Sequence, residues 1–110
     1  MLIYKILLPS EWDGFEAAGR FDGSPLDRDS GYVHCSSREQ VAVVAGHLFA
    51  SEPTLVVAAL DADVLGEAVR WEAADGGTFP HVYAPLPRDA VVSVHRIAGA
   101  ASVDEVLPRK

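Results

Sequence analysis

Two histidines lie inside short apolar segments of this sequence and are the first candidates for chemistry. His34 is part of GYVHCS at residues 31–36, and His81 is part of FPHVY at residues 79–83. Alternate side chains of an extended chain share a face, so Tyr32 and Ser36 should lie beside His34, and Tyr83 beside His81. Imidazoles titrate near neutral pH, so either histidine can act as a general acid or base, or donate a hydrogen bond to a sugar hydroxyl.

The same residues also allow a purely structural role. A half-buried histidine that bonds to a loop carbonyl fits the pattern, and the residues alone favour this interpretation for both His34 and His81. Cys35 shares the face of Val33 and is expected to be a small buried hydrophobe rather than a nucleophile. His34 and Cys35 point apart, and the four histidines form no close pair, so we expect no metal site.

Lys5, Trp71 and Glu72 are also candidate site residues, but each has a structural alternative. Lys5 stands in the middle of the apolar run LIYKILL at residues 2–8, where it must reach solvent, pair with a carboxylate or line a cleft. An edge-strand lysine that blocks aggregation is the favoured interpretation. Trp71 is more often a core residue than a stacking platform, and Glu72 more often a solvated strand residue than an acid. His47 and His95 are expected to be structural.

The elements that must position these residues follow from periodicity and turn signals. A first helix should begin at Ser10 with a capping box to Asp13 and stop at Gly19, and a second should begin at Ser36 or Ser37. The segment at residues 21–30 is rich in Asp, Ser, Gly and Pro and is expected to be a loop. Strands are expected at residues 2–8, 31–35, 54–60, 68–72, 78–84 (with Pro80 at an edge or start) and 90–97.

This order of elements predicts an α+β fold: a compact single domain with two helices packed on small, mostly antiparallel sheets. The domain should span residues 1–98, followed by a partly ordered C-terminal tail at residues 99–110. On folding, a chain of 110 residues buries roughly two-thirds of the surface that the unfolded chain exposes. It therefore needs no metal or disulfide to stabilise the fold. A flexible turn is expected at residues 75–77.

Composition and charge limit the partners. The sequence has 49% hydrophobic residues, a single cysteine and no apolar run of membrane-spanning length, so we expect a cytoplasmic protein that does not enter membranes. Its net charge is −7, and its nine basic residues are scattered singly. Nucleic acid is therefore an unfavourable partner. No Walker loop, GxGxxG or GxSxG motif is present, which leaves kinase, Rossmann and hydrolase interpretations without support.

The motifs together resemble a known family. The run LIYKI at residues 2–6, Asp27, GYVHCS with Gln40, RWE at residues 70–72 and FPHVY are similar to the bacterial domain-of-unknown-function family numbered 952. The resemblance spans nearly the whole chain. It implies an ADP-ribosyltransferase-like fold, in which two small packed sheets enclose a cleft, as in the NAD-using toxins and the RNA 2′-phosphotransferases.

The resemblance also implies roles for residues. In such enzymes polar strand residues hold NAD, an aromatic ring stacks on nicotinamide and an acidic or polar group steadies an oxocarbenium-like transition state. Cleft roles then become the favoured ones for His34 and His81, as catalytic residues or as contacts to the ribose or diphosphate. The implied partner is a small molecule, with NAD or an ADP-ribose-type nucleotide as substrate; the alternative is a sensor domain that binds a ligand without turnover. The implied ligand-binding residues are Tyr4, Lys5, Tyr32, Ser36, Trp71, Glu72 and Tyr83.

Overall fold

The fold is organised around β4 (Leu55–Asp61), the middle strand of an antiparallel three-stranded sheet. The computed structural model describes residues 1–74 and 76–109; Asp75, in the expected turn, and Lys110, in the expected tail, lie outside the described residues. β1 (Leu2–Leu7) pairs with one side of β4 and β8 (Val91–Ile97) with the other. β4 is buried from Leu55 to Leu60, as its continuous apolar run predicts.

The two faces of this sheet support two separate hydrophobic cores. Alternation along β1 sends Ile3 and Leu7 to the first core and Tyr4 and Ile6 to the second, as the two-residue period predicts. Helix α1 (Pro9–Ala18) covers the first core, and α3 (Arg38–Leu48) covers the second. The helix side chains buried in these cores are Trp12 and Phe15 from α1, and Val41 and Ala45 from α3.

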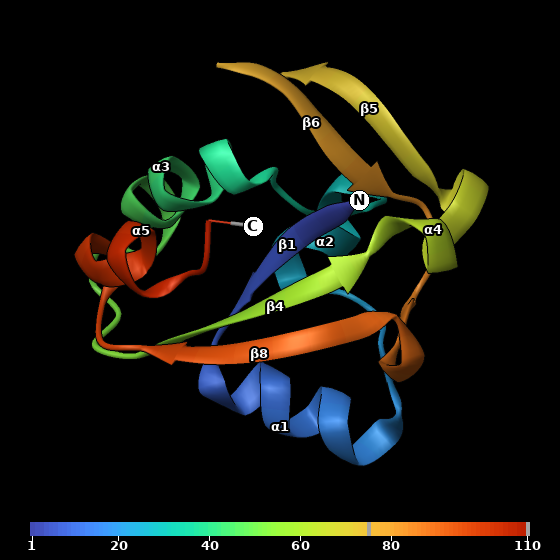
Figure 1. Ribbon diagram of the computed structural model, residues 1–110. Coiled ribbons are helices and arrows are strands. Elements are labelled where there is room, and N and C mark those ends of the chain that lie inside the picture. Colours follow the sequence, from blue (N-terminus) through green and yellow to red (C-terminus); the bar gives the residue numbers. More distant parts are fainter. Residues whose placement is uncertain (75, 110) are drawn as a thin grey trace.

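Two smaller antiparallel sheets complete the α+β fold. β5 (Val69–Ala74) and β6 (Gly77–Val82) form a hairpin that lies to one side of the large sheet in Figure 1. β3 (Val33–His34) pairs with the other side of β6, and this register places His34 directly opposite His81. β2 (Arg20–Phe21) pairs with β7 (Leu86–Pro87). The 3₁₀ turns are Gly66–Ala68, Arg88–Ala90 and Ala100–Ser102.

The expected loop at residues 21–30 is wrong at Phe21, which belongs to β2, and in its second half, which forms helix α2 (Pro25–Ser30). Ser24 caps this helix: its Oγ accepts a hydrogen bond from the Asp27 backbone N–H at 3.2 Å, and the Asp27 carboxylate accepts one from the Ser24 N–H at 2.9 Å. Pro25 fits the first helical position, and Gly31 ends the helix at φ 89°. The turn-forming composition of this segment therefore predicts a loop where Ser24 and Asp27 form a capping box and begin a helix.

The start of α1 and the position of Pro80 also differ from expectation. α1 begins at Pro9, and Glu11 rather than Asp13 makes the capping contact, because its Oε1 accepts from the Leu8 N–H at 2.9 Å. α3 uses Ser37 with Gln40, one of the two expected starts. Pro80 lies inside β6, the middle strand of its sheet. Its carbonyl accepts from Cys35 N–H just beyond β3, so the missing N–H faces that side and removes no bond to β5.

The C-terminal segment packs onto α3. Helix α5 (Val103–Val106) and Leu107 follow the last strand, and Val103 and Leu107 are buried in the second core. Arg38, at the start of α3, donates hydrogen bonds to the carboxylate of Asp104 and to the carbonyls of Asp104, Leu107 and Pro108. The short helix α4 (Ala62–Leu65) follows β4.

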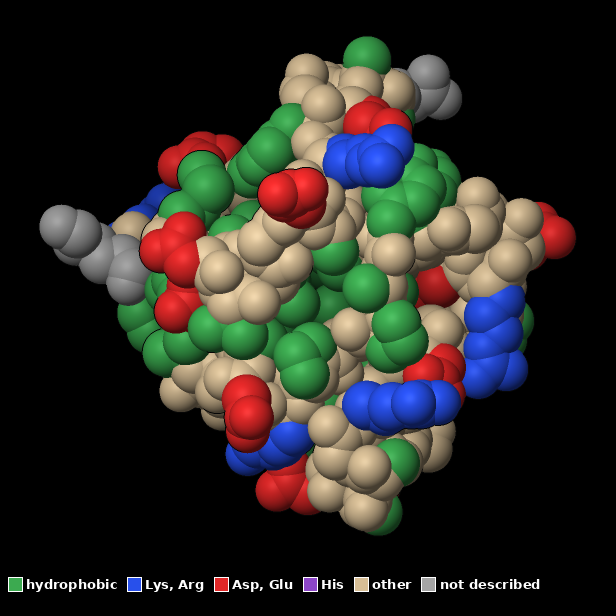
Figure 2. All heavy atoms as spheres, turned by 90° about the vertical axis from the view of Figure 1, so that its right-hand side faces the viewer, with side chains coloured by type: hydrophobic (Ala, Val, Ile, Leu, Met, Phe, Trp, Pro, Cys, Tyr) green, Lys and Arg blue, Asp and Glu red, His purple; other side chains and the backbone are tan. Residues whose placement is uncertain are grey.

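The surface on the α4 side of the molecule carries charges of both signs (Figure 2). On the face in Figure 2, acidic and basic side chains are interspersed among hydrophobic patches, and no histidine is visible. Among residues 1–74 and 76–109, no helix is long and apolar enough to cross a membrane.

We predict that Leu107→Ala lowers the free energy of unfolding by about 2–5 kcal/mol, because it opens a cavity in the second core. Urea denaturation measures this loss. Val106→Ala is the matched control, since Val106 is 46% exposed and its truncation should cost less than about 0.5 kcal/mol. Equal stability of the two variants would contradict a C-terminal segment that is part of the core.

Candidate functional site

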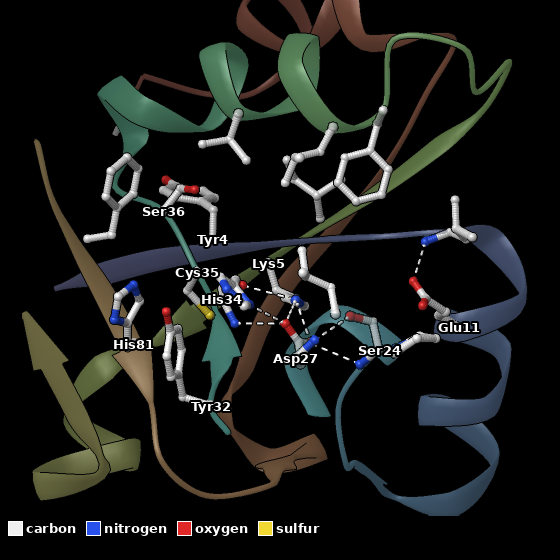
Figure 3. A pocket seen from close by; sticks show the side chains of 18 of the residues that line it. Tyr4, Lys5, Glu11, Ser24, Asp27, Tyr32, His34, Cys35, Ser36 and His81 are labelled. Carbon is white, nitrogen blue, oxygen red and sulfur yellow. Dashed lines mark hydrogen bonds and ion pairs between the residues drawn. The ribbon is translucent and has the colours of Figure 1, made fainter. Parts of the chain in front are cut away.

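A cavity of about 520 Å³ runs along the free edge of β1, between α3 and the segment that contains α2 and β3 (Figure 3). Six of the nine sequence-predicted site residues line it: Tyr4, Lys5, Tyr32, His34, Ser36 and His81. They come from separate parts of the chain and meet because β1 exchanges two backbone hydrogen bonds with Ser36, through Tyr4.

Asp27, on α2, lines the cavity and is the common hydrogen-bond acceptor of the polar groups around it. Its side chain is 2% exposed. The carboxylate accepts hydrogen bonds from the Lys5 ammonium at 2.9 and 3.1 Å, the His34 backbone N–H at 3.0 Å and the His34 ring Nδ1 at 2.7 Å, besides the capping bond from Ser24. Lys5 also donates to the His34 carbonyl at 3.0 Å. One carboxylate thus ties β1, α2 and β3 together.

The environment of Asp27 keeps it ionised. Burial alone would raise the pKa of Asp27, but the hydrogen bond from the His34 ring, the charge of Lys5 and the backbone N–H groups of His34 and Ser24 outweigh burial. Together they hold this pKa well below the usual range of a carboxyl group. The favoured interpretation of Lys5 as a solvated edge lysine is therefore wrong: Lys5 is a buried ion-pair partner that also lines the cavity.

The ionised carboxylate fixes the orientation of the His34 ring. A carboxylate can only accept hydrogen bonds, so His34 Nδ1 must carry the proton in the 2.7 Å contact with Asp27. Nε2 is then the ring nitrogen left for a ligand. Within the described part of the chain, Nε2 of His34 has no hydrogen-bond partner.

His81 is held in the same way by a different carboxylate. Its Nδ1 lies 2.7 Å from Oε1 of Glu72, and the Tyr83 hydroxyl donates to the same oxygen at 2.7 Å. The hydrogen bonds from Tyr83 and His81 lower the pKa of Glu72, and the bond to Glu72 raises the pKa of Tyr83. Glu72 and Tyr83 are thus placed behind His81 rather than on the cavity wall.

Tyr32 brings the two imidazoles into one aromatic cluster. Its ring stacks on His81 with centroids 4.0 Å apart and lies 4.6 Å from the ring of His34. The two imidazole centroids are 5.9 Å apart. Two histidines with carboxylate-bound Nδ1 atoms can serve as an acid and base pair, or as paired donors and acceptors to the hydroxyls of one ligand.

One predicted position, Trp71, lies outside this arrangement. Trp71 lies on the face of β5 opposite to Glu72 and Ala74, pairs with Pro80 of β6 and is 42% exposed. The structure does not bring it to the cavity. Cys35 does line the cavity but is buried with Val33 in the first core. Burial raises its pKa to about 12, so it is a neutral thiol at physiological pH.

Asp27 is the residue that sequence reasoning missed. The family resemblance includes Asp27 as a position but implies no role for it. The available signal was Ser24-Pro25 followed by Asp27 at capping-box distance, which is typical of a helix start. Among the described residues, no group of three or more His, Cys, Asp and Glu side chains is placed to hold a metal ion.

Comparisons with known proteins agree with this fold. The model of the family described as "Protein of unknown function (DUF952)" matches residues 6–94. The crystal structure of protein CC0527 from Caulobacter crescentus is 43% identical and has a TM-score of 0.84, over 87% of this chain and 85% of that one. The solution NMR structure of CC0527 is 44% identical, with a TM-score of 0.75 over 86% and 82%. No curated protein matches the chain.

We predict that Asp27→Asn destabilises the protein by about 3–5 kcal/mol at neutral pH, because it leaves the Lys5 ammonium buried without its counter-charge. The folded-state pKa of Asp27 is depressed, so its contribution is present above the unfolded value near 3.8 and is lost as the pH falls through and below that value. The stability gap between the wild type and Asp27→Asn should therefore narrow in acid. Denaturant titrations from neutral to acidic pH measure it.

Asp22→Asn is the control for this experiment, because Asp22 forms only an exposed ion pair with Arg20 and should change stability little. A gap between wild type and Asp27→Asn that does not depend on pH would contradict an ionised Asp27.

We predict that Glu72→Gln lowers the pKa of the Tyr83 phenol toward its usual value, because the hydrogen bond to the Glu72 carboxylate is the largest cause of its elevation. Carbon NMR of ring-labelled tyrosine, recorded against pH, follows the three tyrosines separately. Glu67→Gln, at an exposed glutamate on the neighbouring 3₁₀ turn, should leave the Tyr83 titration unchanged. An unaltered Tyr83 pKa in Glu72→Gln would show that the Tyr83, Glu72 and His81 chain does not exist in solution.

Proposed function

This chain belongs to the DUF952 family, and from that premise we propose that its cavity is an active site for NAD or an ADP-ribose-type ligand, on an ADP-ribosyltransferase-like fold. One observation carries the proposal. His34 and His81 lie opposite each other on paired strands, each with Nδ1 held by a carboxylate, and both line the same cavity. Such an arrangement suits a ligand with several hydroxyl groups around one reacting carbon.

Each cavity group has a task in this proposal. The Nε2 atoms of His34 and His81 bond the ribose hydroxyls or the diphosphate, and Ser36 adds a hydroxyl on the wall beneath α3. Tyr32, already stacked on His81, offers an aromatic edge or face to a base. Tyr4 and Lys5 form the β1 side of the cavity, with Lys5 acting through its ion pair with Asp27.

The reaction would be substitution at the anomeric carbon of the ribose next to nicotinamide. The bond from C1′ to the nicotinamide nitrogen breaks with its electron pair leaving on nicotinamide, and a bond from C1′ to the oxygen of water or of an acceptor hydroxyl forms. The proton released from that oxygen goes to an unprotonated Nε2 of His34 or His81. A cytoplasmic location belongs to the same proposal, supported by the single, buried, unpaired thiol of Cys35.

A second candidate, binding without turnover, is favoured by the state of the carboxylates. Asp27 is committed to Lys5 and His34, and Glu72 to His81 and Tyr83. Of the described residues that line the cavity, Glu11 is the remaining carboxylate, and it lies at the end formed by α1. A sensor that binds a nucleotide needs no acid to steady a developing oxocarbenium ion, whereas the transferase needs one.

We predict that NAD or ADP-ribose binds in isothermal titration calorimetry and that His34→Ala and His81→Ala each weaken binding at least about tenfold, the effect of losing one or two hydrogen bonds. His95→Ala is the matched control, because His95 lies on β8, bonds to Ser93 and does not line the cavity. Chromatographic assay of nicotinamide then separates the two candidates: release that His34→Ala abolishes supports the enzyme, and binding without release supports the sensor. Absence of binding, or equal binding by all variants, would refute both.

A further inference from the structure

The cavity has a second end, away from the histidines, whose lining is mostly apolar. Leu8, Leu26, Val44, Leu48 and Phe49 surround it, contributed by the start of α1, by α2 and by the end of α3. Figure 3 shows this end on the side of Ser24 and Glu11, opposite His81. Leu26 and Leu48 remain 48% and 56% exposed although both border the cavity. An apolar group that enters here would cover surface that the fold leaves in contact with water.

The backbone of β1 offers a polar anchor at the same end. Tyr4 uses its outward N–H and C=O to bond Ser36, and the Leu8 N–H is taken by Glu11. Ile6 lies between them on the same edge, since alternate residues of a strand direct their backbone groups to the same side. Among the described residues, Ile6 forms no backbone bond on that side. Its carbonyl and its N–H therefore both face the cavity, and the carbonyl can accept a hydrogen bond from a ligand donor.

The charge at this end is negative. Lys5 is the one cationic side chain, apart from the histidines, among the described lining residues, and its charge is neutralised by Asp27. The Glu11 carboxylate accepts a hydrogen bond from the Leu8 N–H through one of its two oxygens. A negatively charged group would thus meet Glu11 without a compensating cation, whereas an ammonium group would meet Glu11 and the Ile6 carbonyl together.

We infer that this end is a subsite for an apolar amine, in which an aryl or alkyl group lies between Leu26 and Leu48 and the ammonium donates to Glu11 and to the Ile6 carbonyl. The subsite deepens the proposed function, because it rests on the cavity being a ligand site and gives it a second, chemically distinct occupant. It does not require that the occupant of the histidine end be NAD. The ligand class is defined by apolar contact plus one positive charge.

Three nearly isosteric probes test the inference: benzylammonium, benzyl alcohol and benzoate, titrated into the labelled full chain and followed by backbone amide shifts of residues 6–8 and 44–49. We expect benzylammonium to bind with a dissociation constant in the millimolar range, typical of a small fragment, and at least about tenfold more tightly than benzoate. Leu48→Gln should weaken benzylammonium and benzyl alcohol about tenfold, because it removes an apolar contact. Glu11→Gln retains an acceptor for the Leu8 N–H and should reduce the preference for benzylammonium over benzoate to about threefold or less.

Val43→Gln is the matched control, because Val43 is an exposed residue of α3 that does not line the cavity, and it should change no affinity. Benzoate binding as tightly as benzylammonium, an unchanged affinity in Leu48→Gln, or no shifts with any probe would each overturn the inference. The NAD titration with His34→Ala tests the other end separately. Benzylammonium binding that depends on Leu48 and Glu11, without NAD binding, would keep the amine subsite and refute only the nucleotide proposal.

Discussion

The ionised carboxylate of Asp27 is the interaction on which the site depends. A buried charge is costly unless donors surround it, and Asp27 meets that condition with the Lys5 ammonium, two backbone N–H groups and the His34 ring. The donors come from β1, from the start of α2 and from β3. If Asp27 were neutral, the orientation of His34, the burial of Lys5 and the start of α2 would all lose their common partner. The Asp27 side chain thus sets the start of α2, balances the buried charge of Lys5 and fixes the tautomer of His34.

This constraint explains why the cavity exists beside β1. Lys5 points toward the first core and is drawn to Asp27, so α2 is held against that face of β1, while α3 packs on the opposite face through Val41 and Ala45. The edge of β1 between them is bridged to the rest of the chain only at Tyr4 and Ser36, among the described residues. The space left along that edge is the cavity. Its floor is polar where Asp27 orders His34 and apolar where the leucines of α2 and α3 approach.

Much of the framework could be predicted from the sequence, because local periodicity determines it. Alternation along β1 places Ile3 and Tyr4 on opposite faces, and the continuous apolar run of β4 indicates burial on both faces; the two cores show both. The partner of Lys5 could not be predicted this way, since Asp27 is distant in sequence and lies in a segment whose composition is typical of a loop. Periodicity also says that Trp71 and Glu72 face opposite sides, but only the pairing of β5 with β6 decides which side meets His81.

The proximity of His34 and His81 depends on strand pairing, which local sequence patterns do not determine. Each histidine sits on a short strand, and each resembles a structural residue when considered alone. Their pairing across β3 and β6 places the rings 5.9 Å apart with Tyr32 against both. Two separate carboxylates then hold the two Nδ1 atoms, Asp27 from α2 and Glu72 from β5. A purely structural histidine needs one such partner for stability, but it does not need a second histidine, oriented the same way, on the wall of the same cavity. The duplication is therefore the strongest physical argument that the polar end of this cavity is built for a ligand.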